Sequence, residues 1–494
     1  MGVAYNSRII TDGLVLALDA ANNKSILSTV EVLVVAGGGA GGNGTGSGYE
    51  SGGGGAGGLI YSSSHSITPG SAITATVGAG GASATSSTPA ANGGNSVFGA
   101  LTAIGGGGGA TAPAVGSGGG SGGGGSHNQT GGGSGTAGQG FSGATPAQGS
   151  SGGGGGGAGG PGKSTSSNAD GSGGIGLPFS ISGSLQYYAG GGGGSRHTDV
   201  SGGLGGGGAG VSLSAGYANG SPGGTNTGGG GGGANQPATN TGGGAGGSGI
   251  VIVRYPGPQR ATGGTVTSVG GYTIHTFTTS GTFTPTWGDM STNGNTGTLV
   301  NGPTYNSANG GSIVFDGSND YASFTSNCYN VSLNGTINEL TINAWIYWNS
   351  FPIDNIDEIV SWWETGSQTY SDGFLGVTCS ANGGGTNTNP MIRFGDDWAN
   401  TGASFTASTD VNKWWNITAV KTVDNAYIYK NSTLSATKGS ALSWGFNNNL
   451  AIGRQHGAGE YINAKIANIQ LYNRALSAAE IQQNFNALRG RFGI

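Results

Sequence analysis

Glycine dominates the first half of this chain, and this restricts the folds available to it more than any other feature. The 494 residues include 115 glycines, concentrated between about residues 29 and 260. Glycine loses more backbone entropy on folding than any other residue, and an internal glycine costs about 1 kcal/mol relative to alanine. An ordered glycine-rich segment therefore needs compensation, which close packing of extended backbones with paired amides and carbonyls can supply.

Two observations narrow the form of this packing. Collagen is excluded, because the sequence has no sustained G-X-Y period and only 14 prolines. A flexible linker is disfavoured, because strand-like pieces interrupt the glycine runs at 30–36, 71–79, 96–104, 184–190 and 249–255. We therefore predict sheets of left-handed polyglycine-type helices capped by short β-strands.

Composition excludes several classes of function. Charged residues make up 7% of the chain and the net charge is −5, so no basic stripe is available and we expect no nucleic-acid partner. The start lacks a signal-peptide-like apolar stretch and no apolar run is long enough to span a bilayer, so we expect a cytoplasmically made chain without membrane insertion. The only cysteines, Cys328 and Cys379, are predicted to be buried thiols. The five scattered histidines predict no transition-metal site.

One motif suggests nucleotide binding but lacks the necessary context. Residues 157–164 read GAGGPGKS and fit the phosphate-loop pattern G-x-x-x-x-G-K-[ST]. That loop works between a buried strand and a helix, whereas glycine precedes this stretch and helix-breaking residues follow it. We interpret Lys163 as a solvated lysine within a glycine run.

Particular phrases of the glycine-rich zone resemble the glycine-rich domains of bacteriophage tail-fibre tips and adhesins. They include VEVLVVAGGGAGG (30–42), GGNSVFGALTAIGGGGG (93–109), GGAGGSGIVIVRY (244–255) and YTIHTFTTSGTFTP (272–285). In that family the YTIHTF pair usually precedes VEVLVVAGGG, whereas here it follows, so the order is circularly permuted. In the related adhesins, loops at the distal end of the polyglycine layer carry specificity.

The flanks resemble consecutive pieces of one laminin-G-like, concanavalin-type jelly roll. The matching pieces are ITDGLVLALDAANNKS (10–25), SIVFDGSNDYASF (312–324), TINAWIYW (341–348) and the stretch from 449 to 492. The resemblance implies that a glycine-rich domain is inserted into a loop of the jelly roll, which requires that the two ends of the insert lie close together. We predict three segments: 1–28 as the first part of the jelly roll, 29–285 as the insert, and 286–494 as the remainder.

The C-terminal zone itself reads as an antiparallel sandwich. Strand patterns such as TINAWIYW alternate with Asn-, Gly- and Asp-rich turns, and one helix is predicted at 477–488 with Ser477 as N-cap and Glu480 completing a capping box. Trp345, Trp414 and Trp415 are predicted to pack in the sandwich. The expected fold class is therefore all-β: a jelly-roll β-sandwich with an inserted domain of polyglycine-II-type helices and short β-strands.

Aromatic and charged residues on predicted loops are candidates for binding a glycan or receptor. Sugars bind where an aromatic face meets Asp, Asn or Arg groups that hydrogen-bond the hydroxyls, although half-buried or solvated loop residues would look the same in sequence. The candidates on the sandwich are Trp362, Trp363, Asp396, Asp397, Trp398, Arg454 and His456. The candidates in the glycine-rich zone are Tyr49, Glu50, Arg196 and His197, which could equally be spacers.

Calcium is the one cation for which the sequence offers candidate ligands. Laminin-G-like domains often hold calcium at the sandwich rim, and VFDGSNDY places Asp316 and Asp320 in one turn. DGSND is also an ordinary turn, and two carboxylates form only a weak calcium site. No cofactor is expected to be required.

These observations favour a binding protein over an enzyme. Glycosidases need two carboxylates roughly 5 to 9.5 Å apart in a groove, and the acidic pairs here lie in short polar loops. The leading hypothesis is a phage tail-fibre adhesin on the virion that recognises a host-surface polysaccharide or outer-membrane protein. The alternative is a non-catalytic capsid or tail decoration protein. Contacts with other virion proteins and a homo-oligomer, with a trimer favoured, are expected.

Overall fold

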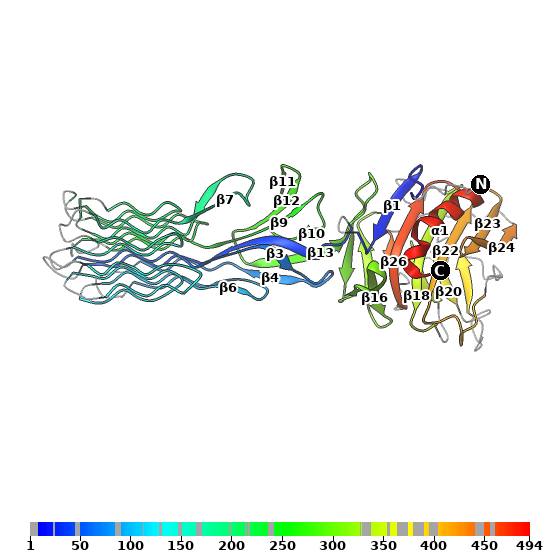
Figure 1. Cartoon of the computed structure of the whole chain (residues 1–494), viewed down its shortest axis with the longest axis horizontal. Helices are drawn as coiled ribbons and strands as arrows, with labels where there is room; N and C mark the ends of the chain where they lie inside the picture. Colours follow the sequence, from blue (N-terminus) through cyan, green and yellow to red (C-terminus); the bar gives the residue numbers. More distant parts are fainter. Residues whose placement is uncertain are drawn as a thin grey trace.

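The fold is that of an elongated, nearly all-β molecule, seen in a computed structural model of the chain (Figure 1). The glycine-rich segment forms a bundle at one end, short strands form the middle, and a β-sandwich forms the other end. The all-β prediction is therefore confirmed. The structure describes residues 8–22, 25–44, 50–83, 90–111, 113–127, 131–146, 151–164, 170–195, 197–198, 200–212, 215, 218–235, 242–326, 328, 337–352, 356–362, 374–378, 390–394, 404–439, 449–454 and 460–494.

One sheet of the sandwich, here called the back sheet, is antiparallel and has the order β15-β16-β26-β18-β22-β23-β24, with β1 also paired to β26. The first strand of the chain thus joins a sheet built from residues nearly 300 to 450 positions later. The strands are β1 (Leu14–Asp19), β15 (Thr304–Asn306), β16 (Ser312–Asp316), β18 (Leu340–Trp348), β22 (Trp414–Lys421), β23 (Asn425–Lys430), β24 (Thr433–Gly439) and β26 (Asn463–Tyr472).

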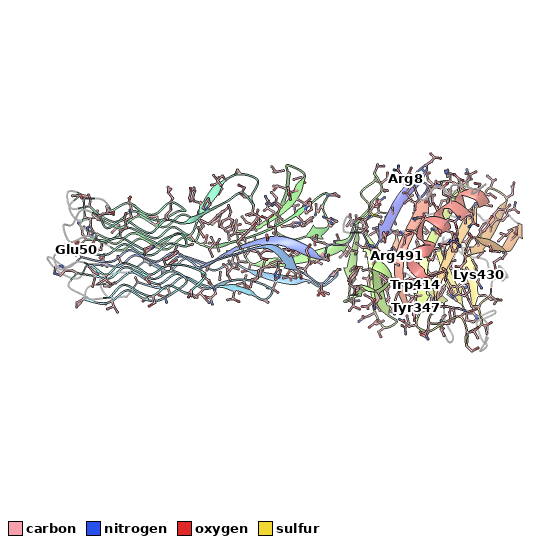
Figure 2. The ribbon with its side chains drawn as sticks, in the orientation of Figure 1. Arg8, Glu50, Tyr347, Trp414, Lys430 and Arg491 are labelled. Carbon is pink, nitrogen blue, oxygen red and sulfur yellow. The ribbon has the colours of Figure 1, made fainter. Side chains whose placement is uncertain are left out.

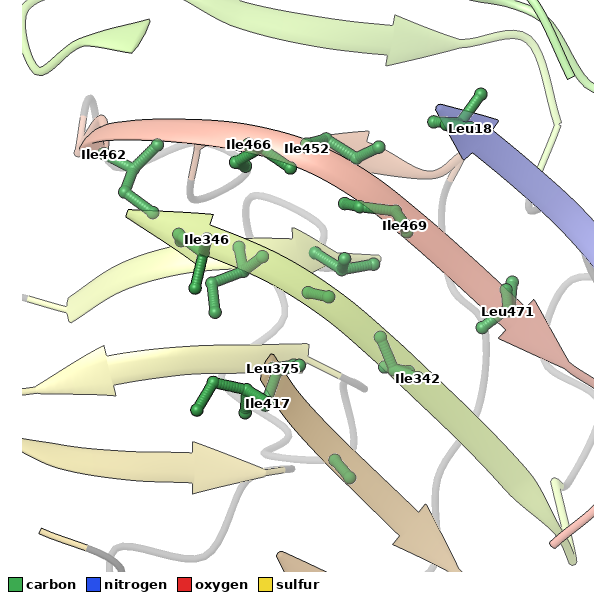
Figure 3. Packing of buried hydrophobic residues seen from close by; sticks show 14 of the residues in the cluster. Leu18, Ile342, Ile346, Leu375, Ile417, Ile452, Ile462, Ile466, Ile469 and Leu471 are labelled. Atoms are coloured by element: carbon green, nitrogen blue, oxygen red, sulfur yellow. The ribbon is translucent and has the colours of Figure 1, made fainter. Parts of the chain in front are cut away.

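The opposing sheet, here called the front sheet, has the sandwich order β21-β20-β19-β25-β17-β14-β13. Alternate side chains of both sheets point inward and form one hydrophobic core, in which isoleucines of β18 and β26 face Leu375 and Ile452 of the front sheet (Figure 3). The strands are β13 (Gly281–Trp287), β14 (Gly297–Val300), β17 (Tyr321–Phe324), β19 (Ile356–Ser361), β20 (Phe374–Thr378), β21 (Met391–Phe394) and β25 (Ala451–Ile452).

Helix α1 (Ala478–Phe492) covers part of the outer surface of the back sheet and has the predicted capping box of Ser477 and Glu480. Trp345 stacks on Phe492 with ring centroids 4.3 Å apart, so this tryptophan packs in the interior as predicted. Arg491 in the last turn forms an ion pair of 2.6 Å with Asp19 of β1, which joins segments near the two ends of the chain. A short 3₁₀ helix, η1 (Ala308–Gly310), lies beside α1.

Short strands form the middle of the molecule. A five-stranded antiparallel sheet has the order β11-β12-β9-β2-β3, and the front sheet continues from β13 into β4, β5 and β6. Four of the five predicted strand pieces coincide with β2, β4, β8 and β9, and the fifth forms the β5–β6 hairpin. The strands are β2 (Thr29–Val35), β3 (Leu59–Ser66), β4 (Ile73–Thr76), β5 (Ser96–Phe98), β6 (Leu101–Ala103), β7 (Leu177–Phe179), β8 (Gln186–Tyr188), β9 (Ile250–Pro256), β10 (Ala261–Thr262), β11 (Thr265–Val269) and β12 (Tyr272–Phe277).

The glycine bundle is held by a hydrogen-bond pattern that repeats every three residues. Within residues 37–42, amides 37 and 40 donate to residues 91–94, amides 38 and 41 donate to residues 244–247, and amides 39 and 42 donate to residues 52–55. Three residues per turn, with each turn bonded to several neighbouring chains, is the polyglycine-II arrangement that the sequence predicts.

Glycine is required in the interior of this bundle because the backbones nearly touch. A Cβ on Gly39 would lie 2.2 Å from the carbonyl oxygen of Gly107, and a Cβ on Gly41 would lie 1.9 Å from that of Gly232. Ordinary van der Waals contact begins near 3.4 Å. Hydrogen bonds between close backbones thus offset the entropy that glycine loses on folding.

The bundle and the sandwich are joined by two strands that lie side by side. Ile26 forms a β-bridge with Trp287, the Gly288 amide donates to the Ser25 carbonyl at 2.7 Å, and the Ser25 hydroxyl donates to the Gly288 carbonyl at 2.5 Å. The chain leaves the sandwich after β1 and returns to it just before β14. The two ends of the glycine-rich segment therefore lie next to each other.

Candidate functional site

The outer surface of the front sheet carries a set of polar side chains that sheet register places together. Residues directly opposite each other in neighbouring strands share a face, and successive residues alternate between faces. Ala322, Ile452 and Val360 are paired and belong to the core, so the neighbouring paired row Ser323, Ala451 and Ser361 faces outward.

Charged residues of β19 and β21 lie on either side of a glycine on this outer face. Gly376 of β20 pairs with Glu358 on one side and with Arg393 on the other. The two charged side chains therefore flank a position without a side chain, across a Cα separation of about 10 Å for two strand spacings. Glu358 is 1% exposed and Arg393 is 7% exposed, so this row is desolvated although it does not belong to the hydrophobic core.

An arginine stacks on a tyrosine ring at the other side of this surface. The Arg454 guanidinium stacks 3.8 Å from the centroid of the Tyr321 ring, and the Tyr461 ring lies 6.3 Å from the Tyr321 ring. The Arg454 carbonyl accepts a hydrogen bond of 2.8 Å from the Ser361 hydroxyl, which fixes the strand end. All three large side chains are half-buried. Arg454, a predicted site residue, thus lies beside two tyrosines that the sequence analysis did not select.

A buried carboxyl group, that of Asp357, lies near the start of strand β19. Burial, followed by the nearby negative charge of Glu460, raises the pKa of Asp357 to about 7, although a hydrogen bond from the Asn463 backbone amide acts in the opposite direction. A carboxyl group with this pKa carries a proton for part of the time near neutral pH. It can therefore donate as well as accept a hydrogen bond at the rim of the sandwich.

The predicted calcium ligands lie in the turn between β16 and β17. The Asp320 carboxylate accepts the Asp316 amide at 3.2 Å, and the Asp316 carboxylate accepts the Ser318 amide at 2.8 Å. Burial, followed by the Asp316 charge, raises the pKa of Asp320. Both carboxylates therefore serve the turn itself. Across the described residues, no three His, Cys, Asp or Glu side chains gather closely enough to hold a metal.

Trp362 is not available to stack on a sugar, which corrects its selection as a site candidate. It is fully buried in the sandwich core. The reason is its position two residues after the inward-facing Val360, because alternation turns both side chains toward the core. The other sandwich candidates, Trp363, Asp396, Asp397, Trp398 and His456, lie outside the described residues.

Two candidates in the glycine bundle are also buried, contrary to their selection as exposed loop residues. Glu50, near the end of the bundle farthest from the sandwich (Figure 2), is 0% exposed and forms a backbone bridge with Asn235. His197 is 0% exposed, and its Nε2 lies 2.8 Å from the Gly152 carbonyl oxygen. Its ring fills the space that a Cβ on Gly171 would need. Tyr49 and Arg196 lie outside the described residues.

A cluster of cations on aromatic rings lies at one end of the paired strands β22 and β23 and was not predicted from the sequence. The Lys430 ammonium lies 4.0 Å from the Phe405 ring centroid and 4.7 Å from that of Trp415, and Lys413 lies 5.1 Å from the latter. Burial lowers the pKa of Lys430, which the nearby Asp410 charge partly offsets. Because lysines already lie over the Trp415 ring, this cluster offers little free aromatic surface.

Among described residues, no helix is long and apolar enough to cross a membrane.

Two family models match the chain, each over one part of it. Residues 21–256 match the family described as "Glycine-rich domain" and residues 316–482 match the "Concanavalin A-like lectin/glucanases superfamily". A comparison with curated proteins finds no match.

Solved structures resemble the chain only distantly. The binding domain of Paraclostridial Mosquitocidal Protein 1 is 14% identical with a TM-score of 0.29, over 40% of this chain and 49% of that one. The botulinum neurotoxin serotype D binding domain is 14% identical with a TM-score of 0.31, over 40% and 47%. Domain 4 of the extracellular arabinanase AbnA from Geobacillus stearothermophilus, in complex with arabinotriose, is 14% identical with a TM-score of 0.31, over 40% of this chain and 91% of that one. This chain thus spans about half the length of the first of these structures. The family models thus identify a glycine-rich domain and a concanavalin A-like domain, each over less than half of the chain.

Proposed function

We propose that this chain is a phage tail-fibre adhesin whose concanavalin-like sandwich binds a glycan on the host surface. The observation that carries the proposal is the outer surface of the front sheet, where the half-buried Arg454 guanidinium stacks on the Tyr321 ring and the Tyr461 ring lies 6.3 Å from that of Tyr321. Tyrosine faces and arginine donors are the groups that contact sugar rings and hydroxyls. The match to a lectin and glucanase superfamily supports the same class of ligand.

The shape of the molecule supports an adhesive role. The bundle and the sandwich lie at opposite ends of one elongated body, so either end can present a surface far from the other (Figure 1). A bundle in which each backbone bonds to several neighbours is stiff, because no side-chain layer is available to slide. Such a rod suits a fibre that holds a binding surface away from a particle.

Glycan binding can be tested on an array of bacterial surface polysaccharides with the full-length chain. Replacing Arg454 with alanine removes the charged donor and leaves both tyrosines, so we expect affinity for the bound glycan to fall about tenfold or more. Arg489→Ala is a matched control, because Arg489 lies in α1 on the back-sheet side of the sandwich. Equal affinity of the two variants would contradict the placement of the binding site at Arg454. Binding only to an outer-membrane protein would contradict a glycan as the ligand.

The location on a virion requires a separate experiment. Immunogold electron microscopy of source particles, with antibody raised against residues 29–285, should place gold at tail or fibre tips. Gold distributed evenly over the capsid would contradict the adhesin and favour a decoration protein.

A further inference from the structure

We infer that one side of the glycine bundle is a docking groove for a glycine-rich segment of another polypeptide chain, bound in the same three-residue extended conformation as the bundle itself. The groove has a volume of about 530 Å³, and it is lined by residues 160, 161 and 163, by residues 172, 173 and 175, and by residues 201–204. A peptide partner at this groove is distinct from a glycan on the sandwich, and its binding does not depend on glycan binding.

The floor of this groove is a segment whose other sides are fully bonded. The Gly173 amide donates to the Ser201 carbonyl at 2.9 Å, and the Gly174 amide donates to the Gly155 carbonyl at 2.9 Å. The Gly174 carbonyl accepts from the Gly191 amide, and the Ile175 carbonyl accepts from the Gly159 amide at 2.8 Å. The segment thus has bundle neighbours on every side except the one facing the groove.

On the groove side, backbone groups lack the partners that they have elsewhere in the bundle. Among the described residues, the Ile175 amide reaches no acceptor and the Gly173 carbonyl receives no donor. On the groove wall, Gly202 has neither an acceptor for its amide nor a donor for its carbonyl within the described chain. The surface therefore presents donors and acceptors together, which is the complement of a peptide backbone.

The walls of the groove favour an unbranched neutral chain. Ile175 is 44% exposed and Leu204 is 60% exposed, so their methyl groups present apolar surface of the kind that glycine methylenes can cover. Lys163 is the one cation among the lining residues, and it pairs with Asp170 at 3.4 Å, so the groove has no charge to neutralise. The lining includes no aromatic side chain, which disfavours a sugar ring as the occupant.

The occupant follows from continuity with the packing inside the bundle. Interior chains are held by amide and carbonyl groups that repeat every three residues, and the groove offers the same groups at the next position outward. Side chains larger than glycine are excluded between interior chains, where a Cβ would come within about 2 Å of a carbonyl. A glycine-rich segment meets both requirements.

The test uses the full-length chain and an acetylated hexaglycine amide as the probe. Ile175→Pro removes the orphaned amide without breaking an internal hydrogen bond, and proline favours the extended φ of a polyglycine helix. Ile175→Ala is the matched control, because it shortens the same side chain but keeps the amide. We expect amide NMR shifts of Gly202 on adding the peptide, and affinity about tenfold weaker for the proline variant than for the alanine variant.

A second pair of variants keeps the test valid if the proline variant folds poorly. Leu204→Trp fills the groove from an exposed position, whereas Val115→Trp places the same bulk at another exposed site of the bundle, where the wild-type side chain is 57% exposed. Loss of peptide binding in the first and its retention in the second supports the groove. No binding by the wild-type chain, equal binding by all variants, or equal binding of a (Gly-Val)₃ peptide would overturn the proposal.

Discussion

Replacing single glycines by alanine should separate interior from surface positions of the bundle sharply. At Gly39 the new Cβ would lie 2.2 Å from the Gly107 oxygen, about 1.2 Å inside ordinary contact. The Gly39 amide bonds to Gly55 at 2.8 Å and its carbonyl accepts from Gly231 at 2.9 Å. A shift of that size stretches both bonds to about 4 Å, where they no longer hold. Each buried hydrogen bond lost costs about 1–3 kcal/mol, and a stiffer unfolded chain offsets up to about 1 kcal/mol of the total. Gly39→Ala should therefore cost about 1–6 kcal/mol.

Gly160→Ala is the matched control. Its Cβ would meet only the Ile175 Cγ2 atom, at 3.5 Å, which is ordinary contact. This variant should be neutral or stabilised by up to about 1 kcal/mol. Differential scanning calorimetry on the full chain measures both, with wild type alongside. Free energies of unfolding within about 0.5 kcal/mol of each other would contradict this prediction, because the overlap at Gly39 would then be relieved at no cost.

Three further predictions concern titration and the helix. Burial and Glu460 hold the pKa of Asp357 near 7, above its unfolded value, so the contribution of Asp357 to the free energy of unfolding falls as the pH rises from about 4 to 7. Asp357→Asn should therefore stabilise the protein by roughly 2–4 kcal/mol at pH 8, measured by denaturant titration. An unchanged difference at pH 4 and pH 8 would contradict this. Burial depresses the pKa of His275, so stability should fall as pH drops below about 6.5, and His275→Gln should flatten that slope in melting curves. Phe492→Ala removes the ring stacked on Trp345 and should cost about 3 kcal/mol by chemical denaturation; a change under about 1 kcal/mol would show that α1 is not anchored there.

Much of the fold could be predicted from local signals in the sequence. Glycine content, strand-like pieces and the Ser477–Glu480 capping box each specify structure over a few residues, and each corresponds to an observed element. The polyglycine arrangement was accessible because interior close packing leaves glycine as the only residue that fits. The resemblance placed residues 10–25 in the jelly roll, but the pairing of β1 with β26 was not predicted, since no local pattern joins positions so far apart.

The candidate site was harder to predict because it depends on register between distant strands. Glu358, Gly376 and Arg393 form a row only when β19, β20 and β21 align, and nothing in the three segments taken separately fixes that alignment. Trp362 was misassigned although alternation with Val360 indicates an inward side chain. Glu50 and His197 were misassigned because a large polar residue among glycines suggests an exposed loop, whereas here the ends of packed chains enclose it.

The paired connection between bundle and sandwich determines how the molecule can bear load. Tension that pulls the far tip away from the sandwich passes through two covalent chains, one on each side of the Ile26–Trp287 bridge. The bundle and the sandwich cannot be separated by breaking a docking interface, because the chain enters the bundle from β1 and returns to the sandwich through β13. Separation requires unravelling one of the two folded parts. A molecule built this way would fail under load by unfolding rather than by dissociation, and after the load is released it would remain one chain that can refold.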